Sequence, residues 1–151
     1  MDLKCLIKLL LEKKIILESR TIRDNQNRVM VKTFKFDYYE VLEKLQDSIY
    51  DEENIIIDNG NRKELFIANK TYLKEFLIDK LNGELEGSIK TNQIGIADYK
   101  LKNIFRNDED IRVENTLSGI IRVYNLKEKR RLKEIEQQKK DKVIAFLNEL
   151  P

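Results

Sequence analysis

Apolar residues recur with helical spacing in a short segment of the second half of the chain. Leu101, Ile104 and Phe105 stand at i, i+3 and i+4, which predicts one buried face of a helix that Asp98 caps and that ends near Asn107. At 100° per residue, a second face lies about 160° away from the first. Four polar residues share that second face: Tyr99, Lys102, Asn103 and Arg106. The pattern therefore predicts a helix that buries one side and displays the other.

Alternation replaces helical spacing immediately after this helix. Apolar and polar residues alternate over 111–114 and again over 120–124, with a short turn from Asn115 to Gly119 between them. This pattern predicts an antiparallel hairpin, flanked by Arg112 and Arg122. Before this helix in the chain, we expect a helix over 71–81 capped by Asn69 or Thr71, a short strand over 84–86, and a second brief helix within 88–96.

The first half of the chain alternates between the same two periodicities. Helical spacing predicts a helix over 3–13, and a second helix from the capping-box pattern of Asp37 and Glu40 to about Tyr50. Strand patterns predict hairpins over 15–36 and over 55–67, the latter turning at Asn59-Gly60. Together these elements indicate an α+β fold. We expect an N-terminal α+β lobe over 1–83, a second unit over 69–124 that shares the helix 71–81, and a C-terminal helix over 125–151.

The C-terminal helix opens with another capping-box pattern, formed by Asn125 and Glu128. Its apolar seam is interrupted near Gln138 and Lys139, which divides it into a basic first half and an apolar second half. The second half carries four large residues as a candidate interface: Val143, Phe146, Leu147 and Leu150. We expect this face either to join two copies of the chain or to pack on the helix 3–13.

Charge changes the picture only locally, because the 151 residues carry a net charge of just +2. Residues 88–106 hold four basic side chains against Asp98 alone, and they coincide with the displayed helix. The abundance of Ile, Lys and Asn is typical of an AT-rich genome. No apolar run is long enough to cross a membrane and no signal-peptide pattern is present, so the expected location is cytoplasmic, without a membrane partner.

The chain lacks the residues that several kinds of catalysis require. The chain contains no His and one cysteine, Cys5, which excludes an intramolecular disulfide and a cysteine-cluster metal site and which we expect to be packed among apolar neighbours. Glycine-rich phosphate loops are absent. Asp58 and Glu64 flank the second hairpin turn, but Phe66 stands where a metal nuclease would carry a lysine. We therefore expect no enzymatic activity, no catalytic residue, no cofactor and no metal.

The order of elements over 69–124 resembles the winged helix-turn-helix superfamily. The resemblance implies that the helix from Tyr99 to Arg106 reads the major groove of a nucleic acid, most simply double-stranded DNA, and that the hairpin is a wing contacting phosphates or the minor groove. Lys100 should then lie beside the reading face and meet phosphate. The remaining expected contacts come from the wing and the start of the last helix: Arg112, Arg122, Lys127 and Arg130.

A second interpretation is a subunit or adaptor that uses the same fold as a protein-docking module. The weak overall charge favours it, and an exposed apolar patch on the second half of the last helix would favour it further. A positive band from the displayed helix to Lys127 and Arg130 would favour nucleic acid instead.

Overall fold

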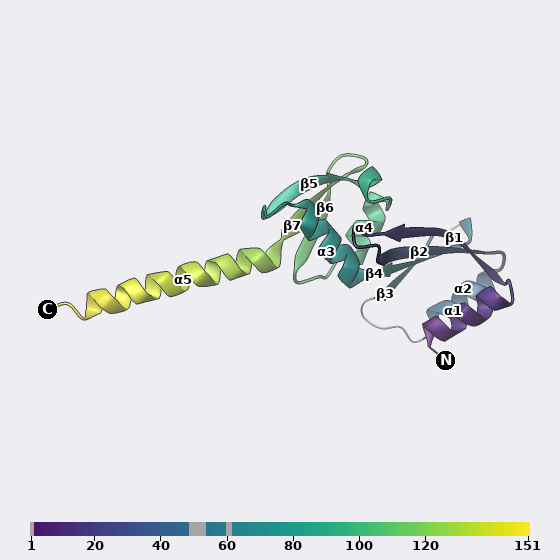
Figure 1. Cartoon of the computed structure of the whole chain (residues 1–151), viewed down its shortest axis with the longest axis horizontal. Helices are drawn as coiled ribbons and strands as arrows, with labels where there is room; N and C mark the ends of the chain where they lie inside the picture. The colour runs from purple at the N-terminus through teal and green to yellow at the C-terminus, as the bar shows by residue number, and fades with distance from the viewer. Residues whose placement is uncertain (1, 49–53, 60–61) are drawn as a thin grey trace. The chain divides into compact units, whose positions relative to one another are not determined.

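The computed structural model describes residues 2–48, 54–59 and 62–151, which form two compact units (Figure 1). Unit 1 runs from Met1 to Leu77 and unit 2 from Ile78 to Pro151. The described residues form five α-helices and two antiparallel sheets, so the fold class is α+β. The boundary between the units falls inside helix α3 (Lys70–Lys80), the helix that the sequence placed in both lobes.

Unit 1 is built on a four-stranded sheet in the order β1-β2-β4-β3. Both predicted hairpins are present, and they join side by side because β2 pairs with β4, with Thr33 opposite Phe66. Gly60, in the turn predicted for the second hairpin, lies outside the described residues. The elements that precede α3 are α1 (Leu3–Glu12), β1 (Ile16–Arg23), β2 (Val29–Phe36), α2 (Tyr39–Gln46), β3 (Asn54–Asp58) and β4 (Glu64–Asn69).

Helices α1 and α2 supply the apolar side chains that cover one face of this sheet. Leu6 of α1 and Leu45 of α2 are buried in one cluster with Phe34 of β2 and Leu65 of β4. The apolar stripe predicted for α1 is therefore the stripe that packs. Cys5 lies off this stripe and is exposed, so the prediction that it is packed was wrong.

The start of α2 differs from the capping pattern in the sequence. Tyr38, not Asp37, occupies the position before the helix, and no side chain caps the helix there. The carbonyl of Asp37 instead accepts a hydrogen bond of 2.7 Å from the Lys63 ammonium. Glu40 still lies in the first turn, where a carboxylate interacts favourably with the helix dipole.

The turn between β1 and β2 is held by Asp24. Its Oδ1 accepts backbone hydrogen bonds from Gln26 at 2.9 Å and Arg28 at 2.8 Å, and its Oδ2 pairs with the Arg28 guanidinium at 2.7 Å. The same guanidinium pairs with Glu75 of α3 at 2.7 Å and lies 4.3 Å from the ring centre of Tyr72. The polar turn predicted over 23–28 is therefore an ion-paired junction between the hairpin and α3.

Unit 2 is organised around a three-stranded antiparallel sheet in the order β5-β7-β6 (Figure 1). The central strand β7 pairs with β6 through the predicted hairpin and with β5 over a long sequence separation, with Ser88 opposite Arg122. After α3, the elements are β5 (Glu86–Lys90), the 3-10 helix η2 (Thr91–Gln93), α4 (Asp98–Ile104), β6 (Ile111–Asn115), β7 (Ile120–Asn125) and α5 (Leu126–Asn148).

The second helix predicted within 88–96 was wrong over most of its length. Residues up to Lys90 belong to β5, and only the turn of η2 follows before Gly95 adopts a left-handed φ of 82°. Pairing with β7 outweighs the weak helical pattern here. Gly87 lets the strand approach Leu81 closely, since a Cβ at this position would lie 3.0 Å from a methyl carbon of Leu81 and that side chain would have to shift.

The last helix begins where the sequence predicts. Asn125 caps it by accepting a hydrogen bond of 3.0 Å from the Glu128 backbone N–H. The backbone N–H groups of Leu126 and Lys127 both donate to the carbonyl of Asp110, at 2.9 and 3.1 Å. These bonds attach the first turn of α5 to the loop before β6.

Candidate nucleic-acid interface

Helix α4 has the two faces that its spacing predicts. Leu101, Ile104 and Phe105 are at most 3% exposed and form part of the core of unit 2. The four polar residues of the other face are all exposed: Tyr99, Lys102, Asn103 and Arg106. Among the described residues, none forms an ion pair with the side chain of Lys102 or Arg106. The helix therefore presents two cations and an amide to solvent from a rigid support.

The start of α4 is not capped as predicted. Ala97 occupies the cap position, and Asp98 is the first helical residue. The Asp98 carboxylate accepts a hydrogen bond of 2.8 Å from the Tyr99 backbone N–H. It therefore still adds negative charge at the positive end of the helix, from one position further along the chain.

Lys100 does not lie at its predicted position beside the displayed face. It is 9% exposed, and its ammonium lies 6.0 Å from the ring centre of Tyr99. The physical reason is its position, about 40° around the helix from buried Ile104 at 100° per residue, so its stem joins the buried side. Lys100 is thus not displayed for contact with phosphate.

Arg112 and Arg122 lie on the far side of the sheet from α4. The buried side chains of β6 and β7, Ile111 and Val113 among them, form the inner face, and α4 contacts β6 on that face. Successive strand residues point to opposite faces, so the arginines project from the outer face. The structure therefore does not bring them onto one surface with Lys102 and Arg106.

Carboxylates hold both arginines on this outer face. Arg122 donates to Glu86 at 2.9 Å and to the hydroxyl of Ser88 at 3.1 Å, and the bond to Glu86 raises the pKa of its guanidinium. Arg112 pairs with Glu114 at 3.1 Å and stacks on Tyr124, 4.5 Å from its ring centre. The outer face is therefore a network of internally paired charges.

Sequence reasoning missed the strand partners of Arg122. Glu86 and Ser88 were assigned to a connector and to the second helix. Glu86 and Ser88 alternate with Gly87 and Ile89, which is the spacing of a strand. This pattern covers only five residues, and the strand forms by pairing with β7, which is distant in the sequence. Lys90 shares this outer face, opposite Ile120, and is exposed.

The tip of the hairpin carries no basic residue. Thr116 donates from its backbone N–H and its hydroxyl to the carbonyl of Ile120, at 3.2 and 3.1 Å, and Gly119 completes the turn with φ of 77°. Thr91 donates to the Gly119 carbonyl at 2.9 Å, which attaches the tip to η2. Leu117 projects from the tip with 71% of its surface exposed. The Thr116 donors are thus used within the hairpin, and the tip offers the exposed Ser118 hydroxyl, the backbone at residues 117–118 and one apolar side chain.

The basic start of α5 is only partly available. Arg130 donates to the Glu109 carbonyl at 2.6 Å and lies 3.4 Å from the Asp110 carboxylate. Lys127 is exposed. Of the two residues predicted here, Lys127 is therefore the better placed to meet an added anion.

The predicted apolar interface residues of α5 are uncovered. Each is more than half exposed, and α5 has no buried residue. Leu132 earlier on the helix is 42% exposed. The four residues of this candidate interface are Val143, Phe146, Leu147 and Leu150.

The structure does not bring Asp58 and Glu64 together on one face of the sheet. Asp58 stands opposite Leu65 while Glu64 stands opposite Lys35, so adjacent strand positions send the two carboxylates to opposite faces of the sheet. No cluster of three potential metal ligands occurs in the described part of the chain. A hydrogen bond to Asp2 raises the pKa of the Cys5 thiol, which disfavours a reactive thiolate.

Comparison with known proteins gives no relative. No family model matches the chain, and no curated protein and no solved structure matches it either. Across the described ranges, every helix is too short or too polar to cross a membrane.

Proposed function

We propose that unit 2 is a winged-helix-like, non-enzymatic module that binds duplex nucleic acid, most simply double-stranded DNA, in a regulatory or accessory role. The order helix, strand, turn, helix and hairpin over residues 70–125 supports the resemblance. The observation that carries the proposal is the displayed face of α4. Three buried residues fix the orientation of the helix, and this leaves Lys102, Asn103 and Arg106 facing outward.

The chemistry of this face suits base edges and phosphates. Arg and Asn are the side chains that bind guanine and adenine edges in bidentate fashion, and Lys neutralises phosphate. From Tyr99 to Ile104 the helix rises about 8 Å, the length of about two base pairs, and Arg106 follows in the turn after the helix. Tyr99 is 53% exposed and offers a ring and a hydroxyl at the start of the face. The wing tip adds backbone and hydroxyl donors without charge.

An anisotropy titration with a labelled duplex of about 20 base pairs tests this function. We expect Lys102→Ala and Arg106→Ala each to weaken binding by about 5- to 150-fold, the equivalent of about 1 to 3 kcal/mol per specific contact. Lys127→Ala should mainly reduce the dependence of affinity on salt between about 50 and 200 mM. Wild-type protein that does not bind even at low salt would contradict the proposal.

The exposed stripe of α5 favours a second function, the joining of two copies of the chain. At 100° per residue, five apolar residues of α5 fall within about 120° of the helix circumference. Glu136 and Lys139 interrupt this arc. The five residues are Leu132, Ile135, Val143, Phe146 and Leu147, and Leu150 follows after the helix ends.

The charges on the helix favour an antiparallel pair. In a parallel pair, Lys139 would meet its own copy at the centre of the seam, and like charges at short range repel. In an antiparallel pair with Ile135 against Leu147 of the second copy, Lys139 lies beside Val143 instead. This register also brings Arg131 near Glu149 of the other copy, twice in each dimer. The dimer would then present two α4 faces, one from each copy, or serve as a docking subunit.

Disulfide trapping distinguishes the two orientations. In a Cys5→Ser background, the double variant Ile135→Cys with Leu147→Cys should form covalent dimers, while each single variant should not. Cross-linking of either single variant would indicate a parallel pair and contradict the antiparallel arrangement. Light scattering measures the oligomeric state of the full chain and of a chain truncated after Lys142. If both are monomers, dimerisation through α5 is contradicted.

A further inference from the structure

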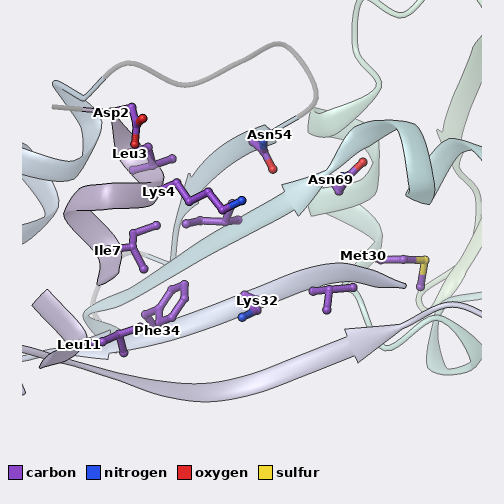
Figure 2. Close-up of a pocket in the computed structure, with 12 residues that line it drawn as sticks. Asp2, Leu3, Lys4, Ile7, Leu11, Met30, Lys32, Phe34, Asn54 and Asn69 are labelled. Atoms are coloured by element: carbon purple, nitrogen blue, oxygen red, sulfur yellow. The ribbon is translucent and has the colours of Figure 1, made fainter. Parts of the chain in front are cut away.

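Unit 1 contains a cavity of about 680 Å³ between α1 and the adjacent face of its sheet. Figure 2 shows α1 on one side and strands β2 and β4 on the other, with Phe34 pointing from β2 into the space. The cavity is distant in sequence from every residue of the proposed nucleic-acid interface. Its volume lies within the range of about 300 to 1,000 Å³ that is usual for small-molecule sites.

The walls of the cavity are apolar because α1 buries only part of its stripe. Leu3 and Leu6 are buried in the core of unit 1, but Ile7 and Leu11, one and two turns further along, remain partly exposed. Ile67 of β4 is likewise only partly buried, on the same sheet face as Phe34. Aliphatic side chains therefore line both sides of the space, which suits an aliphatic ligand body.

Two cations and two amides occupy the polar side of the same cavity. Lys4 extends from α1 over the space in Figure 2, and Lys32 comes from β2. Asn54 and Asn69 stand opposite each other on β3 and β4. Asn69 Oδ1 already accepts a bond of 3.0 Å from Tyr72, so its amide N–H groups are what it can offer a ligand.

Among the described residues, the nearby acidic groups form an ion pair with Lys32 only. The Asp2 carboxylate accepts a hydrogen bond of 2.8 Å from the Cys5 backbone N–H and caps α1. Glu18 lies 3.8 Å from the Lys32 ammonium, at the long end of ion-pair distances, and also accepts from the Thr21 hydroxyl. The formal charges of these two lysines and two carboxylates sum to zero, but no described carboxylate pairs with Lys4, so a ligand anion would gain an ion pair there.

We propose that this cavity binds a small amphipathic anion, with an aliphatic body and one terminal carboxylate. The body lies between Ile7 and Leu11 of α1 and Ile67 of β4. The carboxylate accepts charge-assisted hydrogen bonds from Lys4 and Lys32. This is a binding site separate from the α4 face, and it does not rest on nucleic-acid binding.

Isothermal titration of the full chain with octanoate tests the site. We expect octanoate to bind, and 1-octanol and acetate each to bind at least about tenfold more weakly, because one lacks the charge and the other lacks the body. Lys4→Met and Lys32→Met should each weaken octanoate by about tenfold or more. Lys8→Met is the matched control, since Lys8 lies on the same helix outside the cavity lining and should leave affinity unchanged.

A second variant tests the walls independently of charge. Ile7→Trp enlarges a partly exposed side chain, so it should fill the cavity and abolish binding while the melting temperature stays close to that of the wild type. Four results would each overturn the proposal. These are octanoate that does not bind at millimolar concentration, 1-octanol that binds as well as octanoate, equal weakening by Lys8→Met, and unchanged binding in Ile7→Trp.

Discussion

The two basic surfaces of unit 2 differ in what holds their cations. On the displayed face of α4, Lys102 and Arg106 are exposed, and no described carboxylate pairs with them. On the outer face of the sheet, Arg112 and Arg122 already bind Glu114 and Glu86. A guanidinium that is already bound to a carboxylate has its charge largely neutralised, so it gains less from a phosphate. The number of basic residues therefore says less about anion binding than the partners they already have.

The two surfaces also differ in how their geometry is fixed. The α4 face depends on buried side chains beneath it, whereas the outer sheet face depends on backbone pairing between β5, β7 and β6. A core substitution under α4 should therefore disturb the first surface far more than the second.

The largest effect should come from Leu101→Ala, which removes a side chain with no exposed surface. Lost burial and the resulting cavity should lower the free energy of unfolding by about 2 to 5 kcal/mol. Denaturant unfolding monitored by circular dichroism measures this change. Tyr99→Ala on the same helix should change it by less than about 0.5 kcal/mol, because Tyr99 faces solvent. Equal losses in the two variants would contradict the assignment of the faces.

A smaller effect should come from Asp24, whose partner Arg28 is a carboxylate-bound arginine in unit 1. Burial raises the pKa of Asp24, but hydrogen bonds from Arg28 and Gln26 outweigh it and leave that pKa below its ordinary value. The charged form therefore stabilises the fold fully above the unfolded pKa, near 4, and this contribution is lost as pH falls through the folded pKa.

The variant Asp24→Asn separates this charge from the shape of the turn. Its melting temperature should lie below that of the wild type by a constant amount above about pH 5, and the gap should narrow as pH falls below about 4. Thermal melts across this range measure the gap. A gap that stays constant down to pH 2 would show that the charge of Asp24 does not stabilise the turn. Glu18→Gln, on the same hairpin, is the control.

The smallest effect should come from Arg122→Ala. Since Glu86 and Ser88 already hold this guanidinium, its removal should change affinity for duplex by less than about twofold at moderate salt. Anisotropy titration beside Lys102→Ala provides the comparison. A loss as large as that of Lys102→Ala would place the outer sheet face in the interface.

Local sequence patterns predict much of this structure. The two faces of α4, the hairpin from 111 to 125 and the cap at Asn125 each depend on residues within one element, so spacing alone could predict them. The position of Arg112 on the outer sheet face could also be predicted from the sequence, because its alternation with Ile111 and Val113 puts it away from the core.

Long-range packing decided the rest. Ser88 and Lys90 form a strand because β7 lies beside them, thirty or more residues later in the chain, and no local pattern indicates that. The burial of Lys100 depends on how closely the core approaches the side of α4. The cavity in unit 1 depends on where α1 lies over the sheet, which brings Lys4 and Lys32 together from separate elements.

Chemical-shift mapping of the isotope-labelled chain with an unlabelled duplex tests most directly whether α4 is the nucleic-acid interface. Backbone amide shifts at low salt should change over Tyr99 to Arg106 and over the hairpin tip from Thr116 to Gly119. Those of Glu86, Arg112 and Arg122 should change little. Shift changes confined to the outer sheet face, or no change at any amide when duplex is in excess, would contradict the assignment.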